Sequence, residues 1–413
     1  RVSLISGALP AGLAFDAATG VVSGRATTAG TATFSVQAQD ANGTVATNTY
    51  TLQVGARPDP AQDADVRGLI AAQAAALSRF ATVQTDNITR HLEQIHADPA
   101  CETNVHLELT QDVVPRPLQR SGAAPASVAL PVKAACPSGK VAAWISGSFA
   151  VGSGARSGSS AVGFSTNGVT AGVDARVSKT FVVGIAVGGA SDATSIGNAG
   201  TSLRAGGFDA AAYASYHPGR NLFFDGVVGA DNATFAQNRL NAADATVIPA
   251  NRSAHATFAS LVAGLDYRTG RLQYAPYLRA DSLSSTFDAT SENADPAWAL
   301  SYGAASLTNT ALTGGFRAAY RIDTPLGTLT PLARLELREF SLGGQMQTLT
   351  YRDGLSPASP ALVPGSRDEA LSGSVGLRAN PNEHLTLQLD YDFTSTNGTL
   401  RLHTLRPSIN VRF

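Results

Sequence analysis

The chain has 413 residues, of which 44% are hydrophobic, and its formal net charge is −1. This length allows two or three domains, or one large barrel with a smaller module, and the balanced charge argues against nucleic-acid binding and a polybasic membrane patch. No run approaches the roughly 18 apolar residues of a transmembrane helix, which leaves the alternating strands of a membrane barrel open.

Residues 1–56 are predicted to form a small β-sandwich module. Apolar and polar residues alternate in residues 34–38 and 49–54, and Asn42-Gly43 between them is a hairpin-turn signal. Residues 9–30 have the sequence LPAGLAFDAATGVVSGRATTAG, which resembles the bacterial putative immunoglobulin-like (Ig-like) repeat. The resemblance implies an extracellular spacer or an adhesive unit.

Residues 57–62 are predicted to be a linker, and residues 63–98 one long helix. Ala, Gln, Leu and Arg dominate the second segment, and all are good helix formers. Residues of one face recur at intervals of three and four, and Pro99 ends the pattern: Leu77, Ala81, Gln84, Ile88, Leu92 and Ile95. Such a helix reaches about 50 Å, more than the thickness of a bilayer. A free stalk or coiled coil is the alternative.

Residues 99–139 form a proline-rich connector that contains both cysteines, Cys101 and Cys136. An even pair of cysteines fits an oxidising compartment such as the periplasm, where a disulfide between them would persist. Two separate thiols are the alternative. Neither a Cys-x-x-Cys motif nor a histidine set with ligand spacing is present, so we predict no metal and no cofactor.

Residues 140–413 are predicted to form twelve antiparallel strands, because apolar and polar residues alternate in a regular series of segments. The segments are 141–152, 168–178, 181–191, 203–217, 221–235, 254–267, 272–287, 309–322, 326–342, 368–379, 384–395 and 400–413. Tight turns alternate with longer loops at 153–167, 192–202, 236–253, 288–308 and 343–367. Outer-membrane barrels have this asymmetry, with tight turns in the periplasm and loops outside.

The polar parity of these segments carries charges of both signs, which fits a barrel with lipid outside and a polar lumen. Twelve strands leave room for about one helix, roughly 10 Å wide. We therefore expect helix 63–98 in the lumen, with its charged residues Arg79, Asp86, Arg90 and Glu93 facing the wall. The expected wall charges are Asp174, Arg176, Asp209, Asp266, Arg279, Asp281, Arg334, Glu336, Arg338, Asp390 and Arg406.

The last strand has one apolar face, formed by Leu405, Ile409, Val411 and the terminal Phe413. Pro407 lies on the same parity and lacks a backbone donor. We therefore expect weaker pairing between the first and last strands near this position.

The order of a helix, a twelve-stranded barrel and a terminal phenylalanine resembles the translocator domain of type Va autotransporters over residues 63–413. Residues 168–174 (GVTAGVD), 223–229 (FFDGVVG) and 329–336 (LTPLARLE) resemble it locally. In that family a passenger is delivered to the cell surface, the helix stays in the pore, and assembly machinery recognises the last strand. Residues 1–56 would then be the end of the passenger, and Leu405, Ile409, Val411 and Phe413 the assembly signal.

The resemblance implies a protein of the bacterial outer membrane whose N-terminal region lies at the cell surface. The implied partners are outer-membrane lipid, the barrel-assembly machinery, periplasmic chaperones, the protein's own passenger and a host or surface ligand. Because the chain begins at Arg1 without a signal region, we expect it to be the carboxy-terminal part of a longer precursor. The passenger's identity, its release and the oligomeric state are not predicted.

The sequence contains no Gly-x-Ser-x-Gly elbow and no phosphate-binding glycine motif, so we predict no enzyme. Asp86-Asn87 resembles the place where some family members cut themselves inside the barrel, between two asparagines. Asp86 is a poor nucleophile for that step unless it is protonated, and it would also need a correctly placed lumen acid such as Asp209 or Asp281. A polar helix face paired with the wall is the simpler interpretation.

Three other functions compete with that of a translocator. A surface adhesin would bind ligand through the Ig-like module and the outer loops. A passive channel would use the charged lumen, although the helix predicts a plugged pore. An outer-membrane hydrolase would need a catalytic triad that this sequence lacks.

Overall fold

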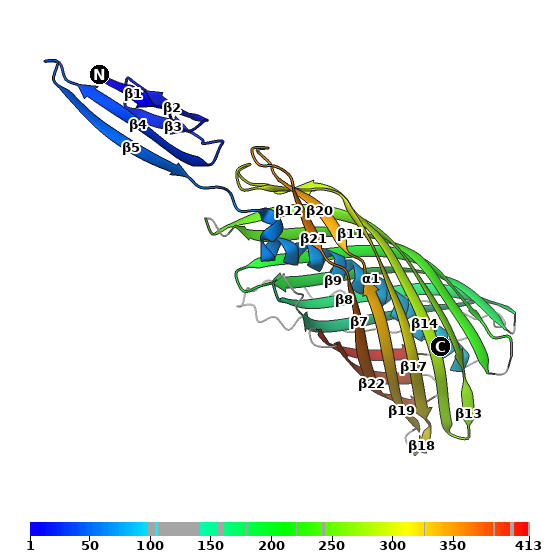
Figure 1. The fold of residues 1–413 in the computed structure, drawn as a ribbon. Coiled ribbons are helices and arrows are strands. Elements are labelled where there is room, and N and C mark those ends of the chain that lie inside the picture. Colours follow the sequence, from blue (N-terminus) through cyan, green and yellow to red (C-terminus); the bar gives the residue numbers. More distant parts are fainter. Residues whose placement is uncertain are drawn as a thin grey trace.

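The computed structural model describes residues 1–97, 104–105, 141–154, 160–178, 180–219, 221–241, 244–325, 327–382, 385–396 and 400–411. Within these residues the chain forms a small β module, one long helix and a closed barrel (Figure 1). The expected cysteine pair, Cys101 and Cys136, and the terminal Phe413 lie outside the described residues.

The N-terminal module is a three-stranded antiparallel sheet with a separate hairpin. The sheet has the order β1–β4–β5, and the hairpin pairs β2 with β3. Their bounds are β1 Val2–Gly7, β2 Leu13–Asp16, β3 Val21–Gly24, β4 Gly30–Gln39 and β5 Val45–Val54. Phe34 is buried and stacks on Tyr50 with ring centroids 5.8 Å apart. The predicted Asn42-Gly43 turn joins β4 to β5, and Gly43 takes the positive φ of 86° that this turn requires.

A short 3₁₀ turn, η1 (Pro60–Gln62), leads into helix α1 (Ala64–Ala97), which has 34 residues. Asp63 caps the helix, because its carboxylate accepts from the backbone N–H of Asp65 at 2.8 Å and of Val66 at 3.4 Å. Among the described residues, no helix is both long and apolar enough to cross a membrane.

Twelve antiparallel strands form the barrel, as predicted, and pairing of the last strand with the first closes it. They are β7 Val141–Gly154, β8 Val162–Ser178, β9 Phe181–Ile196, β10 Thr201–Tyr216, β11 Leu222–Asn241, β12 Thr246–Leu265, β14 Leu272–Phe287, β17 Ala305–Tyr320, β19 Gly327–Leu342, β22 Ser366–Asn382, β23 Leu385–Thr396 and β24 Arg401–Val411. Short strands β13 Tyr267–Thr269 and β18 Ile322–Thr324 extend two of the tight turns. They lie at the end of the barrel opposite the N-terminal module (Figure 1).

At the other end, the predicted loops contain more strand than expected. Residues 236–253 were predicted to form a loop, and this prediction was wrong. Strands β11 and β12 continue through this stretch and pair as far as Asn241 and Thr246. The loops 288–308 and 343–367 also fold, into a four-stranded sheet in the order β15–β16–β20–β21. Its strands are β15 Thr290–Ser291, β16 Leu300–Tyr302, β20 Gln345–Tyr351 and β21 Ser359–Val363. These segments lack the apolar contrast of a lipid-facing strand, so alternation alone does not reveal them.

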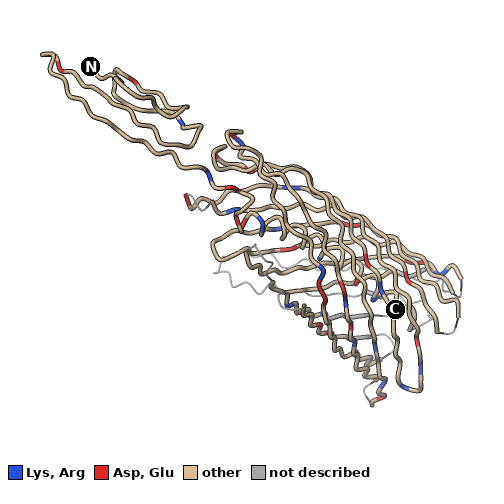
Figure 2. Tube along the Cα trace, viewed as in Figure 1, with Lys and Arg blue, Asp and Glu red and all other residues tan. Residues whose placement is uncertain are grey.

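The outer surface of the barrel is apolar. Ile185, Leu261 and Leu337 are 63%, 67% and 60% exposed, whereas charged residues such as Asp174 and Asp209 are buried inside. Charged positions are sparse along the barrel trace in Figure 2, which is mostly tan. This is the lipid-facing and lumen-facing alternation of an outer-membrane barrel.

The seam between the first and last strands is short. Backbone pairing of β24 with β7 runs from Arg401 to Leu405 and stops two residues before Pro407, where we expected the ladder to weaken. A short strand, β6 (Asn104–Val105), pairs in parallel with Trp144 and Ile145 of β7. Leu405 points outward, as predicted, and is 47% exposed. The side chains of Ile409 and Val411 lie outside the described residues.

Candidate functional site

The lumen of the barrel holds α1, which packs mainly against β8, β9, β10 and β11. Five residues of the predicted helix face are buried there: Leu77, Ala81, Gln84, Ile88 and Leu92. The opposite face carries small residues, among them Ala71, Ala75 and Ser78, and borders a cavity of about 400 Å³. We call this space the side cavity. Its other wall is formed by β14, β17, β19, β22, β23 and β24.

Two wall glycines allow the helix to approach the barrel closely. A Cβ atom on Gly188 would lie 2.3 Å from the side chain of Gln84, and one on Gly207 would lie 2.7 Å from Phe80. Both separations are shorter than an ordinary contact between heavy atoms, so the helix can pass here only because the wall has no side chain.

The first charged contact between helix and wall is that of Arg79 with Asp192. The Arg79 guanidinium lies 2.7 Å from the Asp192 carboxylate and 4.0 Å above the ring of Phe164. It also donates to the hydroxyls of Thr166 and Thr194. The sequence did not identify Asp192, because this residue fell in a predicted loop. The alternation of buried Asp192, Thr194 and Ile196 was the available signal.

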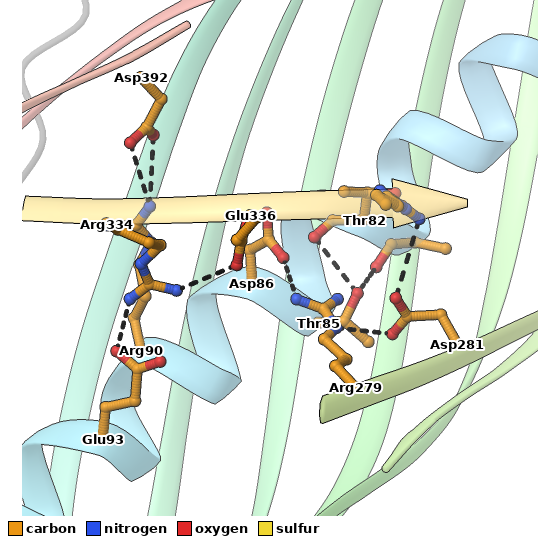
Figure 3. Close-up of polar contacts among 12 residues, drawn as sticks. Thr82, Thr85, Asp86, Arg90, Glu93, Arg279, Asp281, Arg334, Glu336 and Asp392 are labelled. Carbon is orange, nitrogen blue, oxygen red and sulfur yellow. Dashed lines mark hydrogen bonds and ion pairs between the residues drawn. The ribbon is translucent and has the colours of Figure 1, made fainter. Parts of the chain in front are cut away.

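The second contact surrounds Asp86 and is drawn in Figure 3. Arg279 donates to Asp86 at 2.6 Å and to Asp281 at 2.7 Å. Arg406 lies 3.8 Å from the other oxygen of Asp86, and Arg338 lies 3.8 Å from Asp281. One helix carboxylate is therefore held by arginines from two strands, β14 and β24.

The third contact is that of Arg90 with two carboxylates of β23. Arg90 lies 3.2 Å from Asp392 and 3.9 Å from Asp390 (Figure 3). Arg406 also donates to Asp392, at 2.6 Å, and so joins this contact to that of Asp86. Asp392 lies on the predicted polar face, but alternation alone does not distinguish it from Asp390.

The fourth contact is that of Glu93 with two arginines. Its carboxylate lies 2.7 Å from Arg334 on β19 and 2.8 Å from Arg317 on β17. Arg317 also pairs with Asp266 at 2.8 Å, and Arg334 lies 3.5 Å from Glu336. The structure thus places all four predicted helix charges against wall charges of opposite sign.

An aromatic cluster that sequence analysis missed joins His91 of α1 to the wall strands β7, β8 and β10. His91 Nε2 and the Asp174 carboxylate share a 2.7 Å hydrogen bond, and the His91 ring stacks on Trp144 with ring centroids 4.4 Å apart. The Trp144 indole donates to the Tyr213 hydroxyl at 2.6 Å, and that hydroxyl donates to Asp174 at 3.2 Å. Asp174, predicted as a wall charge, therefore meets a histidine of the helix.

Two predicted wall charges, Asp209 and Arg176, take no part in the contacts described above. Asp209 lies directly opposite Asp231 on the next strand, and both are 2% exposed. Phe80 of the helix and the Asp231 carboxylate both lie beside Gly207 of β10. Arg176 is half-buried on β8, and no ion pair joins it to another described residue.

The geometry argues against self-cleavage at Asp86-Asn87. Asp86 is ion-paired with Arg279, which favours the carboxylate, and a carboxylate is the unreactive form for that step. The Asn87 amide donates to the Thr170 hydroxyl at 2.9 Å. Phe80 lies at Gly207, two residues from Asp209 on β10, and it is six positions, or about 9 Å, along the helix from Asp86. Asp281 is itself held by Arg279 and Arg338.

A closed barrel with an apolar outer surface and a charged lumen that holds one helix defines a class of protein: an outer-membrane barrel with a helix-filled pore. The comparisons with known proteins then identify the family. The family model described as autotransporter beta-domain matches residues 143–392, more than half of the chain, and the chain belongs to this family. A second model, described as a putative Ig domain, matches residues 2–55.

Solved structures with a similar fold include two autotransporter domains. The translocator domain of NalP from Neisseria meningitidis is 14% identical, with a TM-score of 0.52, and the match covers 66% of this chain and 89% of that chain. The beta domain of the Bordetella autotransporter BrkA is 14% identical, with a TM-score of 0.48, and the match covers 66% of this chain and 99% of that chain. No curated protein sequence matches. At this identity the likeness to NalP shows the fold alone.

The chain is therefore an autotransporter β-domain of the bacterial outer membrane that is preceded by an Ig-like module. The family serves transport and secretion. A barrel of this kind is embedded in outer-membrane lipid and carries its own passenger.

Proposed function

We propose that the barrel delivers the N-terminal region of its own chain to the cell surface and then anchors it there through α1. One observation carries this proposal. The four helix charges between residues 79 and 93 all meet wall charges of opposite sign, on strands from β9 to β24. A helix that only passed through the lumen would have no need of matched partners.

We further propose the division of the chain that the sequence suggested. Residues 1–56 form the Ig-like end of the passenger, 57–62 the linker, 63–98 the pore helix, 99–139 a connector closed by a Cys101–Cys136 disulfide, and 140–413 the translocator. The module acts as a spacer or an adhesive unit, since its family model is that of an Ig-like domain. The last strand, with Leu405, Ile409, Val411 and Phe413, serves as the signal for the assembly machinery and chaperones.

The proposal is tested by epitope accessibility in the full chain expressed in an outer membrane. An epitope placed after residue 55 should bind antibody on intact cells, whereas the same epitope in the turn at residues 217–219 should bind only after permeabilisation. Removal of Phe413 should lower both signals, because less barrel is inserted. An outer epitope that stays hidden while the turn epitope is exposed would contradict the orientation.

A passive channel remains a second candidate, because the side cavity gives the lumen free volume beside the helix. Uptake of small solutes that depends on the protein, with the helix intact, would favour it. We propose that neither the barrel nor the Ig-like module is catalytic, and that the surface ligand of the module, where one exists, is bound outside the membrane.

A further inference from the structure

The four-stranded sheet at the outer end of the barrel sits over the start of α1. We call this sheet, residues 290–302 and 345–363, the cap. Its core includes Tyr302, Leu349 and Ala361, and it buries Val66 and Ile70 of the helix completely. Part of the hydrophobic core of the cap is therefore supplied by the helix and not by the loops that form the sheet.

A buried ion pair ties the cap to the barrel wall. Glu292 of the cap accepts from the Nε and Nη2 atoms of Arg239 on β11, both at 2.7 Å. The same carboxylate accepts from the Tyr302 hydroxyl at 2.9 Å and from the backbone N–H of Leu300 at 2.8 Å. Glu292 and Arg239 are 1% and 4% exposed. These donors come from the barrel wall and from the cap itself, and they meet one buried side chain, so the cap has one well-defined seated position.

The cap also holds the linker that enters the barrel. Arg57 donates to both oxygens of Asp353, at 2.9 and 2.5 Å, and lies over the Tyr351 ring at 5.0 Å. The Tyr351 hydroxyl donates to the backbone carbonyl of Pro58 at 2.9 Å. Bidentate pairing and stacking together fix the linker relative to the cap.

A third group of contacts joins the helix, the wall and the cap deeper in the mouth. Arg252 of β12 is 3% exposed and donates to Gln73 of the helix at 2.8 Å. It also donates to Gln347 of the cap at 3.3 Å and to the backbone carbonyl of Gly303 at 3.0 Å. The Arg252 guanidinium therefore makes all of these hydrogen bonds only when helix α1 and the cap are both in their observed positions.

The cap closes the side cavity at its outer end. Gln345 and Val363 of the cap line this cavity, as do Leu342 and Gly343 just before the cap. At its inner end the cavity reaches the arginines and carboxylates that hold the helix. If the cap were to lift, the free volume beside the helix would open to the outside.

We propose that the cap is a latch that recognises the seated stalk, residues 57–73, and closes the outer mouth of the barrel. The latch forms only when these residues stand at this depth, because Val66, Ile70, Arg57 and Gln73 complete its core and its hydrogen bonds. A segment that is still moving through the pore does not present these four side chains to the cap. Closure therefore follows the end of transport. This inference rests on the proposed function.

The test uses the full chain, purified and reconstituted in planar bilayers, with Glu292→Gln and Leu349→Ala as cap variants. We expect both to conduct more ions than the unchanged chain, whose mouth is closed. Amides of residues 64–72 should exchange about a hundredfold faster in Glu292→Gln, as expected when a buried ion pair loses one partner. Amides of residues 80–92 should not change.

Two matched controls isolate the cap. Glu339→Gln removes an exposed carboxylate that pairs with Arg367 on the outside of the barrel, and it should change neither measurement. Leu92→Ala removes a leucine as deeply buried as Leu349, but in the other core, and should leave the amides of residues 64–72 protected. Ile70→Ala combined with Leu349→Ala should open the cap less than the sum of the single changes, since both residues belong to one cluster.

Folded variants that conduct no more than the unchanged chain, with unchanged exchange at residues 64–72, would overturn the latch. If Glu292→Gln does not fold, Leu349→Ala decides the question alone, because it leaves no charge unpaired. Failure of the proposed function looks different: residues 1–56 of the unchanged chain would then be absent from the cell surface. A cap that lifts in these variants while surface delivery stays normal supports the latch.

Discussion

The two halves of α1 are held in the barrel by different interactions. In the outer half, Val66 and Ile70 lie in a hydrophobic core that the cap completes, and Gln73 accepts a hydrogen bond from Arg252. From the middle of the helix inward, Arg79, Asp86 and Glu93 each lie within 3 Å of a wall partner. Ion pairs fix the position of the inner half, because each charge has one set of partners along the lumen. The apolar core around the outer half closes the outer mouth of the barrel, since it excludes water there.

The largest expected effect comes from the inner half. Glu93→Ala leaves Arg317 and Arg334 near each other without their shared carboxylate, and removing one partner of a buried pair costs about 3–5 kcal/mol. We expect a lower thermal midpoint for the folded barrel, measured by its heat-dependent shift in gel migration. Glu339→Ala, which breaks the exposed pair with Arg367, should change stability by less than about 0.5 kcal/mol.

The next effect tests the close packing of the helix on the wall. Gly207→Ala places a methyl group 2.7 Å from the ring of Phe80, which is fully buried, and should destabilise the folded barrel by about 1–3 kcal/mol. Gly206→Ala is the matched control, because no atom lies within 4 Å of its Cβ. Equal stabilities for the two variants in denaturant would mean that the helix does not lie against this part of the wall.

A smaller effect is expected in the outer half. Tyr302→Phe removes one donor to Glu292, which keeps the donors of Arg239 and Leu300. The loss of one such bond costs about 1 kcal/mol. Amide exchange at residues 64–72 should rise by less than in Glu292→Gln, and a larger rise in Tyr302→Phe would contradict the central place of the ion pair.

The pH dependence of the linker comes next. The hydrogen bond from Arg57 holds the pKa of Asp353 below its ordinary value. A lowered pKa stabilises the folded state above the unfolded-state pKa of about 4, and this contribution is lost as the pH falls through the folded-state pKa. Protection of the amides in residues 57–62 should therefore be constant from about pH 8 to 5 and fall below about pH 4. Asp353→Asn should remove this dependence, and a fall already complete at about pH 6 would contradict the assignment.

The smallest effect concerns the Ig-like module. Arg25 lies 3.4 Å from Asp295 and 3.6 Å from Asp353 of the cap, and its own side chain is 44% exposed. Because the Arg25 side chain is exposed and both distances are long, Arg25→Ala should change the stability of the folded chain by less than about 0.5 kcal/mol. A larger change would mean that the module is held to the cap by more than these two contacts.

The sequence was sufficient to predict the strands of the barrel. Lipid outside and water inside make apolar and polar side chains alternate along each strand, with a period of two residues. Leu405 and the apolar face of β23 follow directly from this rule. The pore helix could also be predicted from the sequence, since no other segment combines its length with apolar residues at helical spacing. Where the contrast between the two faces fades, as at residues 236–253, the strand was missed.

The partners of the helix charges required the structure. Their identity depends on the depth and rotation of α1 in the lumen, which no local pattern encodes. Asp392 and Asp390 have the same parity on β23, yet Arg90 lies closer to Asp392. Asp209 has the right parity, but it lies opposite another carboxylate, Asp231, on the next strand. The cap was not predicted from the sequence for a related reason. Glu292 and Arg239 lie far apart in sequence and meet only when the loops fold over the helix.

The central claim is that α1 rests in the lumen against β8 to β11, and a cysteine cross-link tests it most directly. A Cβ atom on Gly168 would lie 2.5 Å from Val83 of the helix. In the full chain in intact outer membranes, with both native cysteines replaced by serine, Val83→Cys with Gly168→Cys should form a disulfide that peptide mass spectrometry detects. Val83→Cys with Gly189→Cys is the matched control and should not. Absence of the first cross-link in a folded barrel, or equal yields of the two, would contradict the account.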